Sequence, residues 1–184
     1  MNAPEEKACR LRAQGLTCAA VAVPLRKPSE PSATRASPLV RRAVPADLAA
    51  LVELENASFS GDRLSLRQWR HHLDNPGAWI LVAAQDGHAA GAAVVFFRSG
   101  SRVARLYSIA VAASLRGRGL GAELLESVER IARRRHCDRL RLEVRADNPQ
   151  AQRLYERHGY QRIAHIEGYY EDGADAWRYE KRLA

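Results

Sequence analysis

A glycine-rich turn at residues 116–121, with the sequence RGRGLG, constrains the fold of this chain more than any other segment. It follows a short apolar run at residues 106–111 and precedes a segment whose apolar residues recur at helical spacing. A turn that enters a helix in this way directs several backbone N–H groups toward one point, where the helix dipole adds positive potential. Arg116 and Arg118 can add charge-assisted hydrogen bonds. The turn therefore predicts a phosphate or pyrophosphate site, with a plain strand–turn–helix corner and solvated arginines as the alternative.

The common phosphate-binding fingerprints do not fit this turn. Its glycines are Gly117, Gly119 and Gly121, so they do not form the Gly-x-Gly-x-x-Gly pattern of dinucleotide-binding domains. The sequence also lacks the Gly-Lys-Ser/Thr triplet of a nucleoside-triphosphate loop. A different kind of phosphate-bearing ligand is indicated.

A second segment, at residues 140–160, reads LRLEVRADNPQAQRLYERHGY. Together the two segments resemble the GNAT superfamily of acetyl-CoA-dependent N-acetyltransferases. The Arg116-x-x-Gly119-x-Gly121 pattern is similar to the coenzyme A pyrophosphate loop of that family. The second segment resembles the RimI-type branch, which acetylates the N-terminal alanine of a ribosomal protein. The resemblance covers roughly residues 38–183.

The order of the expected elements agrees with an α/β fold. A helix between the strand that ends at Val111 and the next strand makes those two strands parallel. Asp86-Gly87 predicts a hairpin between two earlier strands, and Ser65 is expected to cap a helix. The resemblance implies a single GNAT-type domain with a mixed, mostly antiparallel sheet of about six to seven strands, splayed at a central parallel pair and flanked by about four helices. Strands are expected at 39–43, 79–84, 89–97, up to 111, at 139–145, 161–167 and 174–182, and helices at 46–57, 65–73, 119–135 and 149–158.

Residues 1–37 differ in composition from the rest of the chain. Their prolines and small polar residues are typical of a linker, so we expect a flexible N-terminal extension before an acetyltransferase domain at residues 38–184. The apolar decamer at residues 16–25 raises the question of a secretory signal. The early Glu5-Glu6 pair and the lack of a small-x-small cleavage site argue against one.

Composition favours a globular protein that works without a membrane. No apolar run approaches the roughly 18 residues of a membrane span. Three cysteines without metal-ligand spacing indicate a reducing cytoplasm and no metal site. The net charge of +8 comes almost entirely from scattered arginines, and basic stretches lack interleaved aromatic residues, so nucleic acid is not the expected partner.

Glu143 is the candidate general base. Because the apolar residues of its strand alternate, Glu143 shares the opposite face with Arg141 and Arg145. A solvated glutamate that balances these two arginines is the plain structural interpretation. The resemblance implies a catalytic role, because RimI-type enzymes place a base at the glutamate of this LEV motif, acting directly or through water.

Tyr155 is the candidate general acid. It belongs to a helical stripe with Ala151, Leu154 and His158, so a packed aromatic residue is one interpretation. An unperturbed phenol has a pKa of about 10, close to that of an alkyl thiol, and can therefore protonate a leaving thiolate. The resemblance implies this role, because the LY pair of the family motif carries the general acid.

The resemblance also implies a set of contacts with acetyl-CoA. Asn148 is explained structurally as a helix cap followed by proline, and the resemblance adds a contact with the pantetheine arm. The strand before the glycine turn is expected to pair its backbone with pantetheine and to polarise the thioester carbonyl. The expected cofactor-binding residues are Ile109, Ala110, Val111, Arg116, Gly117, Arg118, Gly119, Leu120, Gly121, Ala122 and Asn148.

The acceptor side is less defined by the sequence. Tyr169-Tyr170, between the last two strands, is similar to the substrate-gripping loop of protein N-terminal acetyltransferases, and a pair of hairpin-rim aromatics is the alternative. The usual Pro-Trp of the RimI branch is replaced by residues 59–65, FSGDRLS, which puts the ribosomal substrate in doubt.

The leading hypothesis is an acetyl-CoA-dependent N-acetyltransferase that acts on a primary amine, preferably the N-terminal α-amine of a protein or peptide. A small-molecule amine acetyltransferase and a non-catalytic acyl-CoA-binding module of the same fold stay open. Glu143 and Tyr155 together argue against the non-catalytic module.

Overall fold

The computed structural model describes residues 38–59, 63–85 and 88–184. The expected N-terminal extension and the Asp86-Gly87 turn lie outside the described residues. The elements follow the expected order, with bounds that agree to within about two residues. In chain order they are β1 (Leu39–Arg42), η1 (Pro45–Asp47), α1 (Leu48–Ser58), α2 (Leu66–Asp74), β2 (Ala78–Gln85), β3 (His88–Phe96), β4 (Val103–Val111), η2 (Ala113–Leu115), α3 (Leu120–Arg134), β5 (Arg139–Arg145), α4 (Pro149–Arg157), β6 (Gln161–Ile166) and β7 (Ala176–Arg182).

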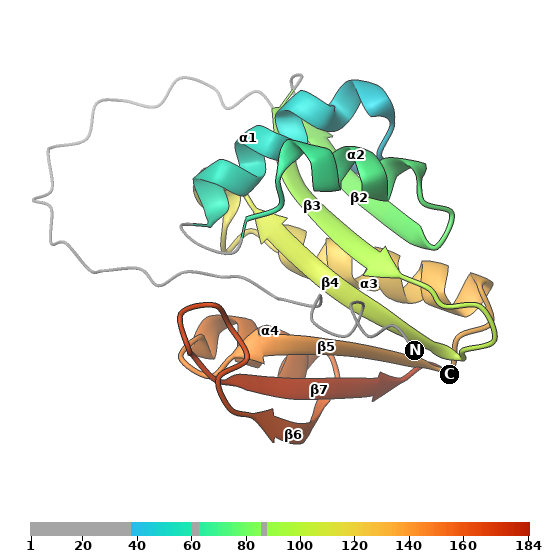
Figure 1. Cartoon of the computed structure of the whole chain (residues 1–184), viewed down its shortest axis with the longest axis vertical. Coiled ribbons are helices and arrows are strands. Elements are labelled where there is room, and N and C mark those ends of the chain that lie inside the picture. Colours follow the sequence, from blue (N-terminus) through green and yellow to red (C-terminus); the bar gives the residue numbers. More distant parts are fainter. Residues whose placement is uncertain (1–37, 60–62, 86–87) are drawn as a thin grey trace, which may run out of the picture.

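The strands form one seven-stranded sheet in the order β1-β2-β3-β4-β5-β7-β6 (Figure 1). Neighbouring strands are antiparallel except β4 and β5, which are parallel as the connecting helix α3 requires. This α/β architecture confirms the predicted fold class. β2 and β3 pair antiparallel up to Gln85 and His88, so the predicted hairpin pairing is also confirmed.

The sheet splays between its two parallel strands. Their pairing runs only from Val103 opposite Arg139 to Arg105 opposite Arg141. β4 continues to Val111 and β5 to Arg145, and the two strands diverge over these stretches (Figure 1). Beyond Arg105 and Arg141 the two strands do not pair with each other, so their backbone groups on these edges are available to a ligand.

Helices cover the sheet in two layers with separate cores. Leu124, Val128 and Tyr155, from α3 and α4, pack on one face against the alternating apolar residues of β5. Leu51 and Trp69, from α1 and α2, pack on the other face over β2 and β3. Ser65 caps α2 as expected, since its hydroxyl accepts a hydrogen bond from the Gln68 N–H at 3.3 Å.

The register assigns the polar residues of β5 to the same face as α1 and α2. Phe96, which packs with the α1–α2 core, is opposite Arg105, and Arg105 is opposite Arg141. Because side chains alternate along a strand, Glu143 also lies on this face. Across the antiparallel pair, Arg178 of β7 is directly opposite Glu143. Arg105, Glu143 and Arg178 therefore share one face, and the α3–α4 core lies on the other.

Candidate active site

The glycine turn has the conformation that its sequence predicts. Gly117 and Gly119 have φ angles of +76° and +87°, a region that residues with side chains rarely adopt. The first hydrogen bond of α3 runs from the Glu123 N–H to the Gly119 carbonyl at 3.1 Å. The N–H groups of residues 120–122 therefore precede the helical ladder and point toward the helix N-terminus. Arg116 reaches back and donates to the Val111 carbonyl at 3.1 Å, which fixes the turn against the end of β4.

A cavity of about 570 Å³ lies between the end of β4, the glycine turn and α4. Its walls combine N–H donors at a helix N-terminus with basic side chains, a donor set that suits the pyrophosphate of a coenzyme. The predicted site residues on its walls are Ile109, Ala110, Val111, Arg116, Gly117, Gly119, Gly121, Ala122, Asn148 and Tyr155.

Five of the predicted site residues do not line this cavity. Arg118 is exposed beside it, and the side chain of Leu120 is buried in the α3–α4 core. Leu120 can contribute to the ligand only through its backbone N–H. Glu143, Tyr169 and Tyr170 belong to the other face of the sheet.

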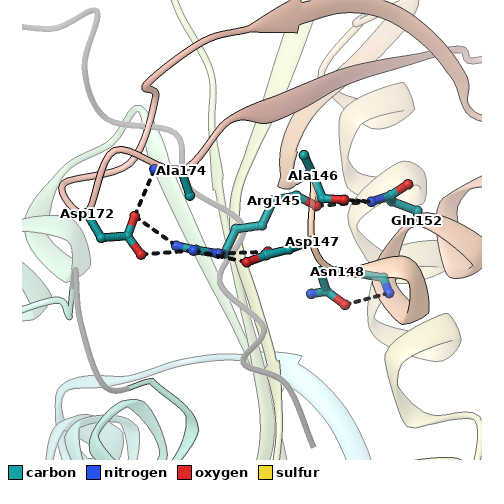
Figure 2. A network of polar contacts seen from close by, with 8 residues as sticks. Arg145, Ala146, Asp147, Asn148, Gln152, Asp172 and Ala174 are labelled. Carbon is teal, nitrogen blue, oxygen red and sulfur yellow. Dashed lines mark hydrogen bonds and ion pairs between the residues drawn. The ribbon is translucent and has the colours of Figure 1, made fainter.

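Asn148 caps α4 as expected and also lines the cavity. Its side-chain oxygen accepts a hydrogen bond from the Ala151 N–H at 3.1 Å, which caps α4 (Figure 2). Gln152, one turn further on, donates to the Arg145 and Ala146 carbonyls at 3.1 and 2.9 Å. These bonds fix the start of α4, and with it the helix that carries Tyr155.

Tyr155 is completely buried from water, yet it forms part of the cavity wall. Its ring packs edge-on against Tyr160 at 5.6 Å and tilted against Tyr179 at 6.2 Å between centroids. The ring is therefore a packed core residue, and its place on the cavity wall is compatible with the predicted role as general acid.

Glu143 is also buried, with 1% of its surface exposed. One carboxylate oxygen, Oε1, accepts from the Arg178 Nε at 2.7 Å and lies 3.0 Å from an Arg105 nitrogen. The other oxygen, Oε2, is buried without a hydrogen-bond partner among the described residues. A solvated glutamate is thus the wrong description, and Oε2 is the atom left to accept a proton.

The charge partners of Glu143 differ from those that the sequence suggested. Arg141 pairs with Glu180, and Arg145 pairs with Asp147 and Asp172, so neither balances Glu143. Residues directly opposite each other on adjacent strands lie closer together than residues two apart on one strand. Cross-strand pairing therefore replaces the same-strand pairing that the sequence suggested.

Arg145 joins the start of α4 to the loop between β6 and β7 (Figure 2). Its guanidinium binds Asp147 at 3.1 Å on one side and Asp172 at 2.8 Å on the other. It also lies 4.8 Å above the centre of the buried Tyr170 ring. The hydrogen bonds from Arg145 hold the pKa of Asp172 below its usual value, and those to Asp147 and Asp172 raise the pKa of Arg145.

The two tyrosines of this loop have different positions. Tyr170 is 3% exposed and packs under Arg145, which is a structural role. The Tyr169 hydroxyl lies 3.5 Å from an Arg105 nitrogen, and Arg105 pairs with Glu143. Tyr169 is therefore the member of the pair that reaches the Glu143 cluster.

Several residues of the site were not identified from the sequence. Arg153, Arg157 and His158 line the cavity from α4 and its C-terminal end. Arg153 and Arg157 are four residues apart and His158 follows Tyr155 by three, spacings that could have indicated this. Ser58, at the end of α1, carries no such signal. Within the described ranges no group of three or more His, Cys, Asp or Glu residues could hold a metal ion, and no helix is long and apolar enough to span a membrane.

A splayed sheet whose opening meets a glycine turn at a helix N-terminus defines an acyl-CoA-binding class of protein. The acetyltransferase (GNAT) family matches residues 48–160, and the chain belongs to this family. It is an acetyl-CoA-dependent N-acetyltransferase with acetyl-CoA as co-substrate.

Individual relatives agree with this assignment. The chain is 34% identical over 131 residues, 71% of its length and 85% of the relative, to a Bacillus subtilis protein provisionally assigned as a ribosomal protein bS18-alanine N-acetyltransferase. The ribosomal-protein-S18-alanine N-acetyltransferase of Escherichia coli superposes with a TM-score of 0.71 at 26% identity, covering 79% of this chain and 94% of that one. The ribosomal-protein-alanine N-acetyltransferase of Brucella melitensis gives 0.68 at 26% identity, covering 79% and 99%.

Proposed function

We propose that the acceptor is the N-terminal α-amine of a protein or peptide, with Tyr155 as general acid and Glu143 as general base. The observation that carries this proposal is the arrangement of the two buried side chains about the splay. Tyr155 lines the cavity on the α4 side, whereas Glu143 lies on the opposite face of β5, the strand that borders the opening. The cofactor and the acceptor would then reach the opening from opposite faces of the sheet. The names of the relatives, which refer to ribosomal protein alanine, support an α-amine acceptor.

Each residue then has a defined part in the transfer. The acceptor nitrogen attacks the thioester carbonyl carbon, and the carbon–sulfur bond breaks as the amide bond forms. Tyr155 donates its phenolic proton to the leaving sulfur. Glu143 accepts the proton lost by the amine at Oε2, directly or through one water, while Oε1 stays bound to Arg105 and Arg178. Backbone N–H groups at the end of β4 polarise the carbonyl.

The chemistry of the amine favours an α-amine over a lysine side chain. An α-amine has a pKa near 7.7–8.0 and a lysine amine near 10.4. At pH about 7.5 roughly a third of the former is neutral, but only about a thousandth of the latter. A site with one candidate base is better matched to an amine that is already partly neutral.

Mass spectrometry tests this proposal directly. Peptides with a free N-terminus, a small first residue and one internal lysine are incubated with acetyl-CoA, and the modified nitrogen is located by fragmentation. We expect the acetyl group on the α-nitrogen, and no product from matched peptides whose N-terminus is already blocked. Glu143→Gln should slow the reaction most at low pH, where less of the amine is neutral. Exclusive modification of lysine, or of a small amine, would contradict an α-amine acceptor and leave the acetyltransferase assignment intact.

A reducing cytoplasm stays the predicted location. Cys137 is a buried core residue with 6% of its surface exposed, as its sequence context suggested. Burial raises the pKa of its thiol, which disfavours the reactive thiolate.

A further inference from the structure

Two arginines cover the carboxylate of Glu143 on the sheet face opposite the cofactor cavity. The side chains of Arg105 and Arg178 are 29% and 34% exposed, whereas that of Glu143 is 1% exposed. Both guanidinium groups lie within 3.0 Å of the same oxygen, Oε1. An acceptor that approaches Glu143 from this face therefore meets guanidinium groups before it reaches the carboxylate.

Arg178 has donors beyond those that Glu143 uses. Its Nε donates to Oε1 at 2.7 Å, and its two terminal nitrogens have no hydrogen-bond partner among the described residues. A guanidinium presents its donors in a planar fork that matches a carboxylate. Its terminal nitrogens are thus placed to bind an anion from the solvent side.

The neighbouring arginines are already matched by acidic residues. Arg141 is paired with Glu180, and Arg145 with Asp147 and Asp172. Arg178, by contrast, shares its only described acidic partner with Arg105. Of the arginines around Glu143, Arg105 and Arg178 therefore carry the positive charge that acidic side chains do not fully match.

On the basis of the proposed function, we infer that Arg178 binds an acidic side chain of the acceptor, so that peptides with Asp or Glu as their second residue are preferred. Arg178 lies directly opposite Glu143, one strand spacing of about 4.8 Å away. The second residue of an extended acceptor lies about 3.3 Å further along its backbone, so its carboxylate stays within side-chain reach of Arg178 when the α-amine lies at Glu143. A basic second residue would meet like charge and is disfavoured.

Three peptides that differ only at the second residue test this inference. They begin Ala-Glu, Ala-Gln and Ala-Lys, and kcat/KM is measured for each with saturating acetyl-CoA. We expect the Glu peptide to exceed the Gln peptide by about three- to tenfold, the range for a charge-assisted contact at a partly exposed site. The Lys peptide should be the poorest acceptor. The preference should weaken as salt is raised, because exposed charges are screened.

Variants assign the preference to one side chain. Arg178→Gln should bring the Glu-to-Gln ratio close to one, and Arg178→Lys should restore part of it. The ratio is informative even if either variant slows turnover through Glu143, because both peptides meet the same enzyme. Arg141→Gln, which alters an arginine paired with Glu180 on the same face, should keep the wild-type ratio.

The possible outcomes separate this inference from the proposed function. Acetylation with equal efficiency for all three peptides, or a preference that survives Arg178→Gln, would overturn the acidic subsite and leave the α-amine assignment in place. If no peptide is acetylated, calorimetry on the same peptides decides. If the Glu peptide binds more tightly and Arg178→Gln abolishes this difference, the acidic subsite is supported although the proposed function is contradicted. Equal binding of the three would overturn both.

Discussion

The proposed active site has a cofactor half and an acceptor half, and different kinds of interaction form them. The cofactor half is formed by backbone: two glycines at positive φ, the first N–H groups of α3 and a capped α4. The proposed acceptor half is formed by charged side chains from β4, β5 and β7, together with the ion pair between Arg145 and the loop before β7. One half depends on conformation and the other on charge.

This difference predicts how each half fails. A backbone site tolerates changes of side chain but not a Cβ atom where φ must be positive. A site of paired charges tolerates changes of shape but not the loss of one partner, because the remaining charge is then uncompensated. The predictions below use substitutions that affect one half and spare the other.

The largest effect is expected at Tyr155, which lines the cofactor cavity. Tyr155→Phe keeps the ring packing against Tyr160 and Tyr179 and removes only the hydroxyl. Turnover should fall by roughly 10²–10⁴, with little change in acetyl-CoA affinity, because a general acid acts only in the transition state. Steady-state kinetics and calorimetry measure the two quantities separately.

Tyr179→Phe is the matched control for this experiment. The Tyr179 hydroxyl donates to Glu156 at 2.8 Å, and the Tyr179 ring packs against Tyr155. The substitution therefore removes a hydroxyl group close to the Tyr155 ring. Tyr179 does not line the cavity, and turnover should stay close to that of the wild type. Near-normal turnover in Tyr155→Phe would show that Tyr155 is a core residue only.

The second largest effect is expected in the glycine turn. At Gly119 an added Cβ meets no atom within 4 Å, but the φ of +87° cannot be kept by valine without strain. Gly119→Val should move the turn and weaken acetyl-CoA binding by more than about tenfold, a loss of roughly 1.4 kcal/mol. Calorimetry on the folded variant measures this.

Gly100→Val provides the same strain far from the site. Gly100 has a φ of +75° and open space around its Cβ position, in the turn before β4. Both variants should lose similar stability, and only Gly119→Val should lose affinity. Equal affinities in the two variants would remove the turn from the cofactor site.

The sequence predicted the glycine turn, the helix cap at Asn148 and the helix that carries Tyr155, because these features are local. The φ requirement of Gly119, the cap at Asn148 and the position of Tyr155 each depend on a few neighbouring residues. The parallel pairing of β4 and β5 also follows from a local observation, the single helix between them. Patterns of this length can be recognised without knowing which distant strands become neighbours.

The ion pairs of the proposed acceptor half could not be predicted from the sequence, because they depend on the order of the strands in the sheet. Arg178 meets Glu143 only because β7 inserts between β5 and β6 and pairs in one register. The alternation of apolar residues along β5 identified the face of Glu143 correctly, but it could not identify which strands lie beside β5. The sequence therefore located the base candidate and named the wrong arginines as its partners.

A smaller effect, confined to the acceptor half, is expected at Arg145. Arg145→Gln breaks the bonds to Asp172 and the stacking on Tyr170 that hold the loop carrying Tyr169. The KM for the acceptor should rise about three- to tenfold, in line with the loss of a charge-assisted contact at a partly exposed site. The acetyl-CoA affinity should change little, because Asn148 still caps α4. Asp172→Asn removes the ion pair but not the contact of Arg145 with Tyr170, so the KM for the acceptor should rise by less. A change in cofactor affinity without a change in acceptor KM would contradict the division of the site into two halves.

The smallest effect concerns a titrating group outside both halves, on α2. Burial, with a contribution from the charge of His71, lowers the pKa of His72 from 6.5 to about 4, and its ring packs against Phe96 and Tyr107. Below pH 6.5 the unfolded chain binds a proton that the folded chain does not bind until about pH 4. The neutral side chain therefore contributes stability that is fully present above pH 6.5 and is lost as the pH falls toward 4.

Urea denaturation of His72→Leu at pH 7 and pH 4.5 measures this contribution. The free energy of unfolding should decline less on acidification in the variant than in the wild type, by on the order of 1 kcal/mol after allowance for solvent screening. An equal decline in both proteins would show that His72 does not titrate in this way. The variant also separates stability from activity, because an acid loss of activity that His72→Leu shares with the wild type does not come from the titration of His72. If that shared loss steepens further in Glu143→Gln, the acceptor half is the part of the site that responds to pH.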